Sequence, residues 1–138
     1  MGKIIVLISC VSQKLPNRAK VRDLYVSTLF KLNLKYAEML RPDAIYILSA
    51  KHGLLTLEEV IEPYEVTLNT MRSADIKRWA EQVMGQLSSQ VSLDETKVIF
   101  LAGDKYRRYL LPHIPSYEIP LEGLRIGEQL QKLKELTS

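Results

Sequence analysis

Residues that can move a proton or hold an anion stand together where an apolar run of this sequence ends. The run at residues 44–48 is followed by SAKHGLL, which sets Lys51 and His52 directly before Gly53. A histidine titrates in the range that suits proton transfer, a lysine can hold a phosphate, and a glycine lets the backbone approach a ligand. The stretch therefore indicates a site with His52 as acid or base, although a turn residue hydrogen-bonded to the backbone is the simpler interpretation of a histidine beside a glycine.

Small, polar and basic residues also follow the apolar runs at residues 3–9, 98–102 and 117–121. The candidate ligand-binding residues at the ends of the runs are Ser9, Cys10, Lys14, Ser49, Lys51, Gly53, Gly103, Lys105 and Arg107. Because several of them are cations, we expect an electropositive site that suits phosphate. Glycines and charges are common in the turns of any α/β protein, but that interpretation explains a single loop more easily than all of them together.

Further side chains complete the candidate site. Glu62 and Asp104 are candidate acids or bases, and Tyr64 is a ligand-binding candidate that can stack on a base or sugar. The ordinary alternatives are a solvated glutamate, a helix cap at Asp104 and a packed tyrosine. Cys10 becomes a nucleophile if Lys14 stabilises its thiolate, and a small, partly buried side chain is the simpler interpretation.

The apolar runs predict an α/β fold that would position these residues. Residues 3–9, 44–48 and 98–102 are apolar almost throughout, which is typical of strands covered on both faces of a parallel sheet. Apolar residues at helical spacing predict amphipathic helices over residues 24–40 and 73–87. The alternation predicts a small three-layer sandwich, with a mostly parallel sheet of about four strands and helices on both faces.

Shorter elements are expected in the second half of the chain. The pattern predicts a short helix over residues 106–111, a fourth strand over 117–121 and a last helix over 125–136. The inward face of the last helix is expected to consist of Ile126, Leu130, Leu133 and Leu136. Open parallel sheets bind ligands beyond the carboxyl ends of their strands. We therefore expect the candidate residues to meet at that edge of the sheet.

Composition limits the class of protein. The chain has 138 residues, 46% of them hydrophobic and 25% charged, which predicts one soluble α/β domain over residues 1–138. The first apolar run is too short for a membrane span or a secretory signal, so we expect a cytoplasmic protein without membrane contact. A net charge of +3 permits an anionic partner without requiring one. Oligomeric state cannot be predicted from these features.

Known catalytic and metal-binding motifs are missing from the sequence. It has no Walker-type phosphate loop, G-x-G-x-x-G fingerprint, H-E-x-x-H, G-x-S-x-G or C-x-x-C. One cysteine excludes an internal disulfide, and a chain with only two histidines in addition lacks the four Cys and His ligands of a typical structural zinc site. We therefore expect neither a metal nor another cofactor.

The stretch LSAKHGLLTLEEVIEPYEVTLNTM, residues 48–71, resembles a motif of a family of small, uncharacterised bacterial and phage domains. The loop ISCVSQKLPNRA (residues 8–19), the D-L-Y at residues 23–25 and the ending PLEGLRIGEQLQKL (residues 120–133) fit the same family. The resemblance covers nearly the whole chain. It implies that Lys51, His52 and Tyr64 belong to a site.

A more distant similarity is to the YaaA peroxide-stress family, whose members are associated with DNA binding and with limiting oxidative damage. The matching positions are Ser49, Gly53, Leu54, Leu55, Pro63 and Tyr64. This chain is much shorter and has no glycine-centred hairpin between two helices of the kind that grips a DNA backbone.

Two functions from different classes follow from these patterns. The first is binding of a phosphate-bearing nucleotide, nucleoside or related ligand at the carboxyl edge of the sheet, with metal-free glycosidic or base-modifying chemistry if the protein is an enzyme. The alternative is a non-catalytic protein that binds DNA or another nucleic acid in stress or phage biology, through the basic residues of 14–22 and 105–108. A third interpretation is that the basic residues are simply a solvated surface.

Overall fold

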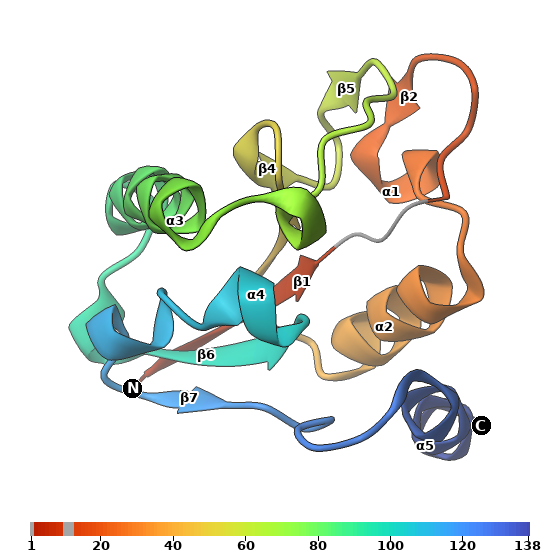
Figure 1. The fold of residues 1–138 in the computed structure, drawn as a ribbon. Coiled ribbons are helices and arrows are strands. Elements are labelled where there is room, and N and C mark those ends of the chain that lie inside the picture. Colours follow the sequence, from red (N-terminus) through yellow and green to blue (C-terminus); the bar gives the residue numbers. More distant parts are fainter. Residues whose placement is uncertain (1, 10–12) are drawn as a thin grey trace.

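The computed structural model describes residues 2–9 and 13–138, and Figure 1 shows the course of the chain. The strands are β1 (Lys3–Ser9), β2 (Ala19–Lys20), β3 (Ala44–Ser49), β4 (Gly53–Thr56), β5 (Val60–Ile61), β6 (Thr96–Leu101) and β7 (Tyr117–Glu118). The α-helices are α1 (Val21–Leu24), α2 (Thr28–Met39), α3 (Ser73–Ser88), α4 (Asp104–Arg107) and α5 (Ile126–Thr137). Short 3₁₀ helices lie at Leu68–Thr70, Leu93–Glu95 and Leu111–His113.

Strand β1 is the centre of the main sheet, whose order is β4-β3-β1-β6-β7 in the described part of the chain. Its side chains alternate between two apolar cores. Ile5 and Leu7 pack in the core that contains the buried face of α3, while Val6 and Ile8 pack in the core that contains α2 and α5. Figure 1 shows α3 on one side of the sheet and the neighbouring α2 and α5 on the other. A strand buried on both faces must be apolar at every position, which explains the continuous run in the sequence.

The prediction of an α/β fold with a mostly parallel sheet is confirmed, since β3, β6 and β7 extend the sheet in parallel from β1. The strand count differs from the prediction of about four, because the sheet has five strands in the described residues. The additional strand is β4, which pairs antiparallel with β3, with Ser49 opposite Gly53. Lys51 and His52 therefore lie in the tight turn of a β-hairpin.

The exposed edge of β4 is closed by side chains. Gly53 adopts the left-handed backbone conformation, with φ of 77°. This turn brings the backbone against α3, where Gln86 Oε1 accepts a hydrogen bond from Leu54 N at 2.9 Å. Glu59 Oε1 accepts one from Thr56 N at 3.3 Å. Because side chains occupy these edge amides, β4 offers a poor template for another strand.

The predicted helix over residues 24–40 begins later in the structure, because Leu24 ends the short helix α1 and α2 begins at Thr28. Ser27 caps α2, because its Oγ accepts a hydrogen bond from Phe30 N at 3.1 Å. Tyr25, which lies between α1 and α2, is not helical and forms an isolated antiparallel bridge with Lys14. Asp23 lies within α1, four residues before the cap of α2 at Ser27. The apolar spacing continues through this break, so periodicity alone could not locate it.

The second half of the chain follows the predictions with shifted boundaries. Helix α3 is confirmed at Ser73–Ser88, with Trp79 buried in the core. The predicted helix over 106–111 is wrong in position, because α4 begins at Asp104 and ends at Arg107. Strand β7 stops at Glu118, shortly before Pro120, which lacks the N–H that would continue the ladder.

Helix α5 is confirmed, and its inward face agrees with the prediction at Leu133 but not at Ile126 and Leu136. Leu133 is fully buried, whereas Ile126 is 63% exposed and Leu136 is 38% exposed. The first turn of α5 is therefore available at the surface. None of the helices in residues 2–9 and 13–138 is both long enough and apolar enough to cross a membrane.

Candidate functional site

A cavity of about 350 Å³ lies at the carboxyl ends of β1 and β6. From β1 the chain continues to β3 on one side and later returns to β6 on the other, so the strand order reverses between β1 and β6. Open α/β sheets bind ligands at such a switch point. The two strand ends are tied together, because Gly103 N donates a hydrogen bond to Ser9 Oγ at 3.2 Å. We refer to this hollow as the β1/β6 cavity.

The lining of the β1/β6 cavity combines apolar walls with polar and charged groups. The apolar lining residues are Leu29, Phe100, Leu101, Ala102, Ile119, Leu121 and Ile126. The others are Ser9, Asn33, Asn69, Gly103, Asp104, Lys105, Tyr106, Arg107 and Gln129. Small-molecule sites in proteins typically have this composition, with apolar surface for affinity and a few polar groups for orientation.

Two cations of α4 are held at this cavity by backbone oxygens. Lys105 Nζ donates to Asn69 O at 3.1 Å, and Arg107 Nη1 donates to Ala102 O at 2.6 Å. An ammonium has three N–H donors and a guanidinium has five, so each keeps donors for an anion. Asp104 forms an ion pair with the neighbouring Arg108, and this pair compensates the negative charge of Asp104.

Asn33 is a polar group that the sequence interpretation missed. It lies on α2, is 4% exposed and lines the β1/β6 cavity. Its Oδ1 has no hydrogen-bond partner among the described residues. An unpaired acceptor of this kind costs about 1 to 3 kcal/mol of stability, so its presence in a folded protein requires an explanation. The available signal was a polar residue four positions from both Leu29 and Ala37 on the apolar stripe of the helix.

A second group, which we term the Tyr64 cluster, consists of Lys14, Tyr25, His52 and Tyr64. Lys14 Nζ lies 4.4 Å from the centre of the Tyr64 ring, and the His52 ring meets the same ring edge-on at 5.5 Å between centres. The hydroxyl groups of Tyr64 and Tyr25 form a hydrogen bond of 2.6 Å. A cation over an aromatic face is a stabilising arrangement, and paired hydroxyls can transfer a proton.

The surroundings of His52 keep its ring neutral near pH 7. Partial burial lowers its pKa below the ordinary value of 6.5, and the positive charge of Lys51 lowers it further, against a smaller opposing effect of Glu59. Its backbone N donates to Ser49 Oγ at 3.0 Å. This bond fixes the hairpin turn, so His52 has a structural role through its backbone, and its ring contacts Tyr64.

Removing the charge of Lys51 should raise the pKa of His52. The Lys51→Ala variant retains the burial but lacks the neighbouring cation, and a ¹H NMR titration of the His52 ring measures the change. The folded pKa lies below 6.5, so His52 favours folding fully above pH 6.5 and this contribution is lost as the pH falls. In His52→Gln that part of the acid-induced decrease in Tm should disappear. An unchanged His52 titration in Lys51→Ala, alongside an unchanged Lys35→Ala control, would contradict this electrostatic account.

The structure separates the predicted site residues. It brings Ser9, Gly103, Asp104, Lys105 and Arg107 together around the β1/β6 cavity. It places Lys14, His52 and Tyr64 in the Tyr64 cluster, and none of these is among the lining residues of that cavity.

The other predicted residues have different surroundings. Ser49 is fully buried, and its carbonyl accepts a hydrogen bond from Trp79 Nε1 at 2.8 Å. Lys51 and Glu62 are exposed. Cys10 lies outside the described residues, so its proposed role as a nucleophile is not addressed by the structure.

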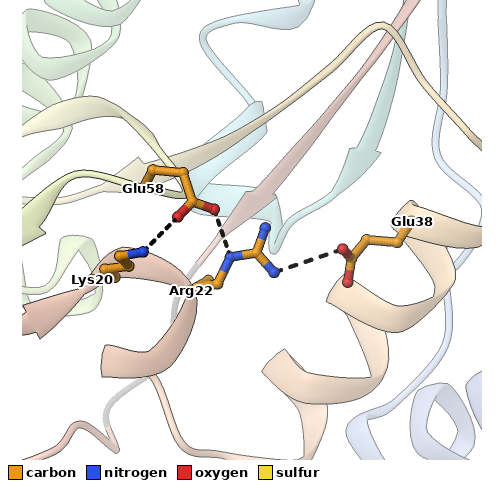
Figure 2. Close-up of polar contacts among 4 residues, drawn as sticks. All are labelled: Lys20, Arg22, Glu38 and Glu58. Carbon is orange, nitrogen blue, oxygen red and sulfur yellow. Dashed lines mark hydrogen bonds and ion pairs between the residues drawn. The ribbon is translucent and has the colours of Figure 1, made fainter.

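Two of the four basic residues at 14–22, Lys20 and Arg22, are paired with carboxylates. Glu58 accepts from Arg22 Nε at 2.8 Å and lies 3.3 Å from Lys20 Nζ, and Glu38 lies 3.7 Å from Arg22 Nη1. Figure 2 shows these four side chains, with Arg22 between the two glutamates. The hydrogen bond between Arg22 and Glu58 lowers the pKa of Glu58 and raises the pKa of Arg22. Paired in this way, Lys20 and Arg22 attract a nucleic-acid backbone less than free cations would.

Other parts of the surface fit a small ligand less well. A hollow of about 630 Å³ at the amino ends of β1 and β6 is lined by Gly2, Lys3, Ile4, Asp94, Glu95, Thr96, Lys97 and Ser116. It lies at the end of the sheet opposite to that used by α/β ligand sites, and its lining is mainly polar. No group of three or more His, Cys, Asp or Glu side chains that could hold a metal ion occurs in residues 2–9 and 13–138.

Comparison with protein-family models gives a match over nearly the whole chain. The model of a family of unknown function, DUF6884, matches residues 5–135. No curated protein was found to match the chain. The match agrees with the resemblance of the KHGLL stretch and its flanking segments to a small uncharacterised family, and it contains no link to the YaaA peroxide-stress family.

Proposed function

The chain belongs to the family of unknown function DUF6884, and we propose that it binds a small phosphate-bearing ligand of the nucleotide or nucleoside class in the β1/β6 cavity. The observation that supports this most is the lining of that cavity, in which Lys105 and Arg107 adjoin buried apolar walls. Its volume of about 350 Å³ is of the size that small-molecule sites have. We also propose that the fold is a three-layer sandwich, with helices on both faces of the sheet and the cavity at the sheet's edge.

The charges favour an anionic group at one part of the cavity. Lys105 and Arg107 follow β6 within α4, and their contacts with backbone oxygens hold both side chains there. A phosphate that accepts from both cations would gain charge-assisted hydrogen bonds, which are about twice as strong as neutral ones. The apolar walls, including Leu29 and Ile126, suit the ring part of such a ligand.

The geometry supports binding more directly than turnover. Of the proposed acid–base residues, Asp104 lines the cavity but is paired with Arg108. His52 and Glu62 are not among its lining residues. Glycosidic or base-modifying chemistry therefore depends on groups that would have to approach the bound ligand, and we restrict the proposal to binding.

A thermal-shift screen tests the proposed function. The protein is heated with nucleobases, nucleosides, mononucleotides, and short single- and double-stranded DNA and RNA. Mononucleotides should raise Tm in the wild type, because a ligand at 100 times its Kd stabilises the folded protein by about 2.7 kcal/mol. The increase in Tm should be much smaller in Lys105→Ala, which lacks one of the two cations proposed to hold the phosphate. Lys35→Ala, which removes an exposed lysine of α2 away from the lining, should respond like the wild type.

The same screen distinguishes the nucleic-acid alternative. Stabilisation by polynucleotides only, with a steep loss of affinity as salt increases, would favour nucleic-acid binding. The ion pairs of Glu58 with Lys20 and Arg22 argue against that outcome. A wild type whose Tm is unchanged by every compound would contradict both functions.

A further inference from the structure

We propose that Asn33 selects the ligand of the β1/β6 cavity, by accepting a hydrogen bond at Oδ1 from an amino group of an adenine-type or cytosine-type ring. The inference rests on the proposed function and specifies which class of nucleotide the cavity takes. Its basis is a buried acceptor that has no partner among the described residues and belongs to a side chain that lines the cavity.

Asn33 and the cations approach the cavity from different faces of the sheet. Helix α2, which carries Asn33, packs in the core that also contains α5. Helix α4 carries Lys105 and Arg107, and its Tyr106 packs in the core on the α3 side. The cavity therefore reaches across the edge of the sheet, with a neutral amide on one side and two cations on the other. This polarity fits a ligand with a heterocycle at one end and a phosphate at the other.

The surroundings of Asn33 favour a ring over a sugar or a second anion. Apolar surface in the same cavity comes from Leu29 of α2, from Ile126 of α5 and from Leu121, which precedes α5. Ile126 is 63% exposed at the first turn of α5, so a bound ring would cover apolar surface that water now contacts. A flat heterocycle matches such walls and still presents polar groups at its edge.

The amide of asparagine matches the edge of a base. Its oxygen accepts from an exocyclic amino group while its nitrogen donates to the adjacent ring nitrogen, which is the pairing that asparagine uses to recognise adenine. The acceptor half of this pairing is the group left unpaired at Asn33. A base that lacks the amino group would leave it unpaired in the complex as well, with a loss of affinity.

A measurement without ligand provides the first test. Leucine has nearly the shape of asparagine but no acceptor, so Asn33→Leu removes an unpaired buried oxygen and should raise Tm by about 2 to 4 °C. An asparagine kept for folding would give the opposite result. A lower Tm, or failure of the Asn33→Leu variant to fold, would overturn the inference.

The second test compares ligands with and without the amino group. Isothermal titration calorimetry is carried out with adenosine 5′-monophosphate and cytidine 5′-monophosphate, each against the analogue that lacks only the amino group. The wild type should prefer at least one amino-bearing nucleotide by about tenfold, and this preference should disappear in Asn33→Leu and in Asn33→Ala, which introduces no extra bulk.

The outcomes separate the inference from the function on which it rests. If the wild type binds mononucleotides and the variants keep the same preference, Asn33 does not select the ligand, although the cavity still binds it. If the wild type shows no preference for the amino group, the inference also fails. If the wild type binds no mononucleotide, the inference and the proposed function fail together.

Discussion

Replacing Lys105 by alanine and Arg107 by glutamine in the same protein should weaken mononucleotide binding by about 100-fold or more. Each cation has donors left over from its backbone contact, and a hydrogen bond to a charged group contributes about 1.5 to 3 kcal/mol. Two such bonds at the lower limit correspond to about 3 kcal/mol, or roughly 100-fold in Kd. Glutamine at position 107 retains a donor for Ala102 O, so the fold around α4 is preserved.

Isothermal titration calorimetry with adenosine 5′-monophosphate and with adenosine measures this effect. The double variant should lose most of its affinity for the nucleotide and little of its affinity for the nucleoside, since the nucleoside has no phosphate. Lys35→Ala serves as the control for loss of one positive charge on an exposed helical surface. Equal affinities of the double variant and the wild type for the nucleotide would show that the phosphate does not bind at α4.

Gly53→Ala should lower the free energy of unfolding by about 2 kcal/mol. The left-handed conformation at φ of 77° costs an alanine about 1 kcal/mol relative to glycine. A Cβ at this position would also lie 2.3 Å from Gln86 Oε1, the atom that accepts from Leu54 N, so that this hydrogen bond has to shift or break. Loss of such a bond contributes about 1 kcal/mol more.

Gly85→Ala is the matched control for the backbone effect. Gly85 is exposed within α3, and a Cβ built there has no atom within 4 Å apart from its chain neighbours and the backbone of its own helix. Alanine is the better helix former by about 1 kcal/mol, so this variant should be more stable than the wild type. Urea unfolding followed by circular dichroism compares all three proteins. A Gly53→Ala protein as stable as the wild type would contradict the described hairpin.

The elements that the sequence predicted well are those whose pattern depends only on burial. Strands β1, β3 and β6 are apolar at nearly every position because both faces of the sheet are covered, and α3 has a regular apolar stripe. Strand β4 could not be recognised in the same way. Its four residues, Gly53–Thr56, follow the turn at Lys51 and His52 directly, and only tertiary pairing with β3 makes them a strand.

The candidate site was predictable where it depends on strand ends. Ser9 ends β1 and Gly103 follows the end of the neighbouring parallel strand β6, so the rule that ligands bind at the carboxyl edge places them together with Lys105. The separation of His52 from this cavity follows from the hairpin, which the pattern did not reveal. Asn33 could not be assigned to the site, because the sequence does not show that its oxygen is left without a partner.

The central claim is most directly tested by mapping a bound mononucleotide onto the structure. Adenosine 5′-monophosphate and cytidine 5′-monophosphate are each titrated into ¹⁵N-labelled protein and followed by ¹H–¹⁵N NMR. The account predicts that, for at least one of them, the largest changes occur at Gly103, Lys105 and Arg107 and at the side-chain amide of Asn33. Changes centred instead on His52 and Tyr64, or on the basic residues between 14 and 22, would contradict binding in the β1/β6 cavity.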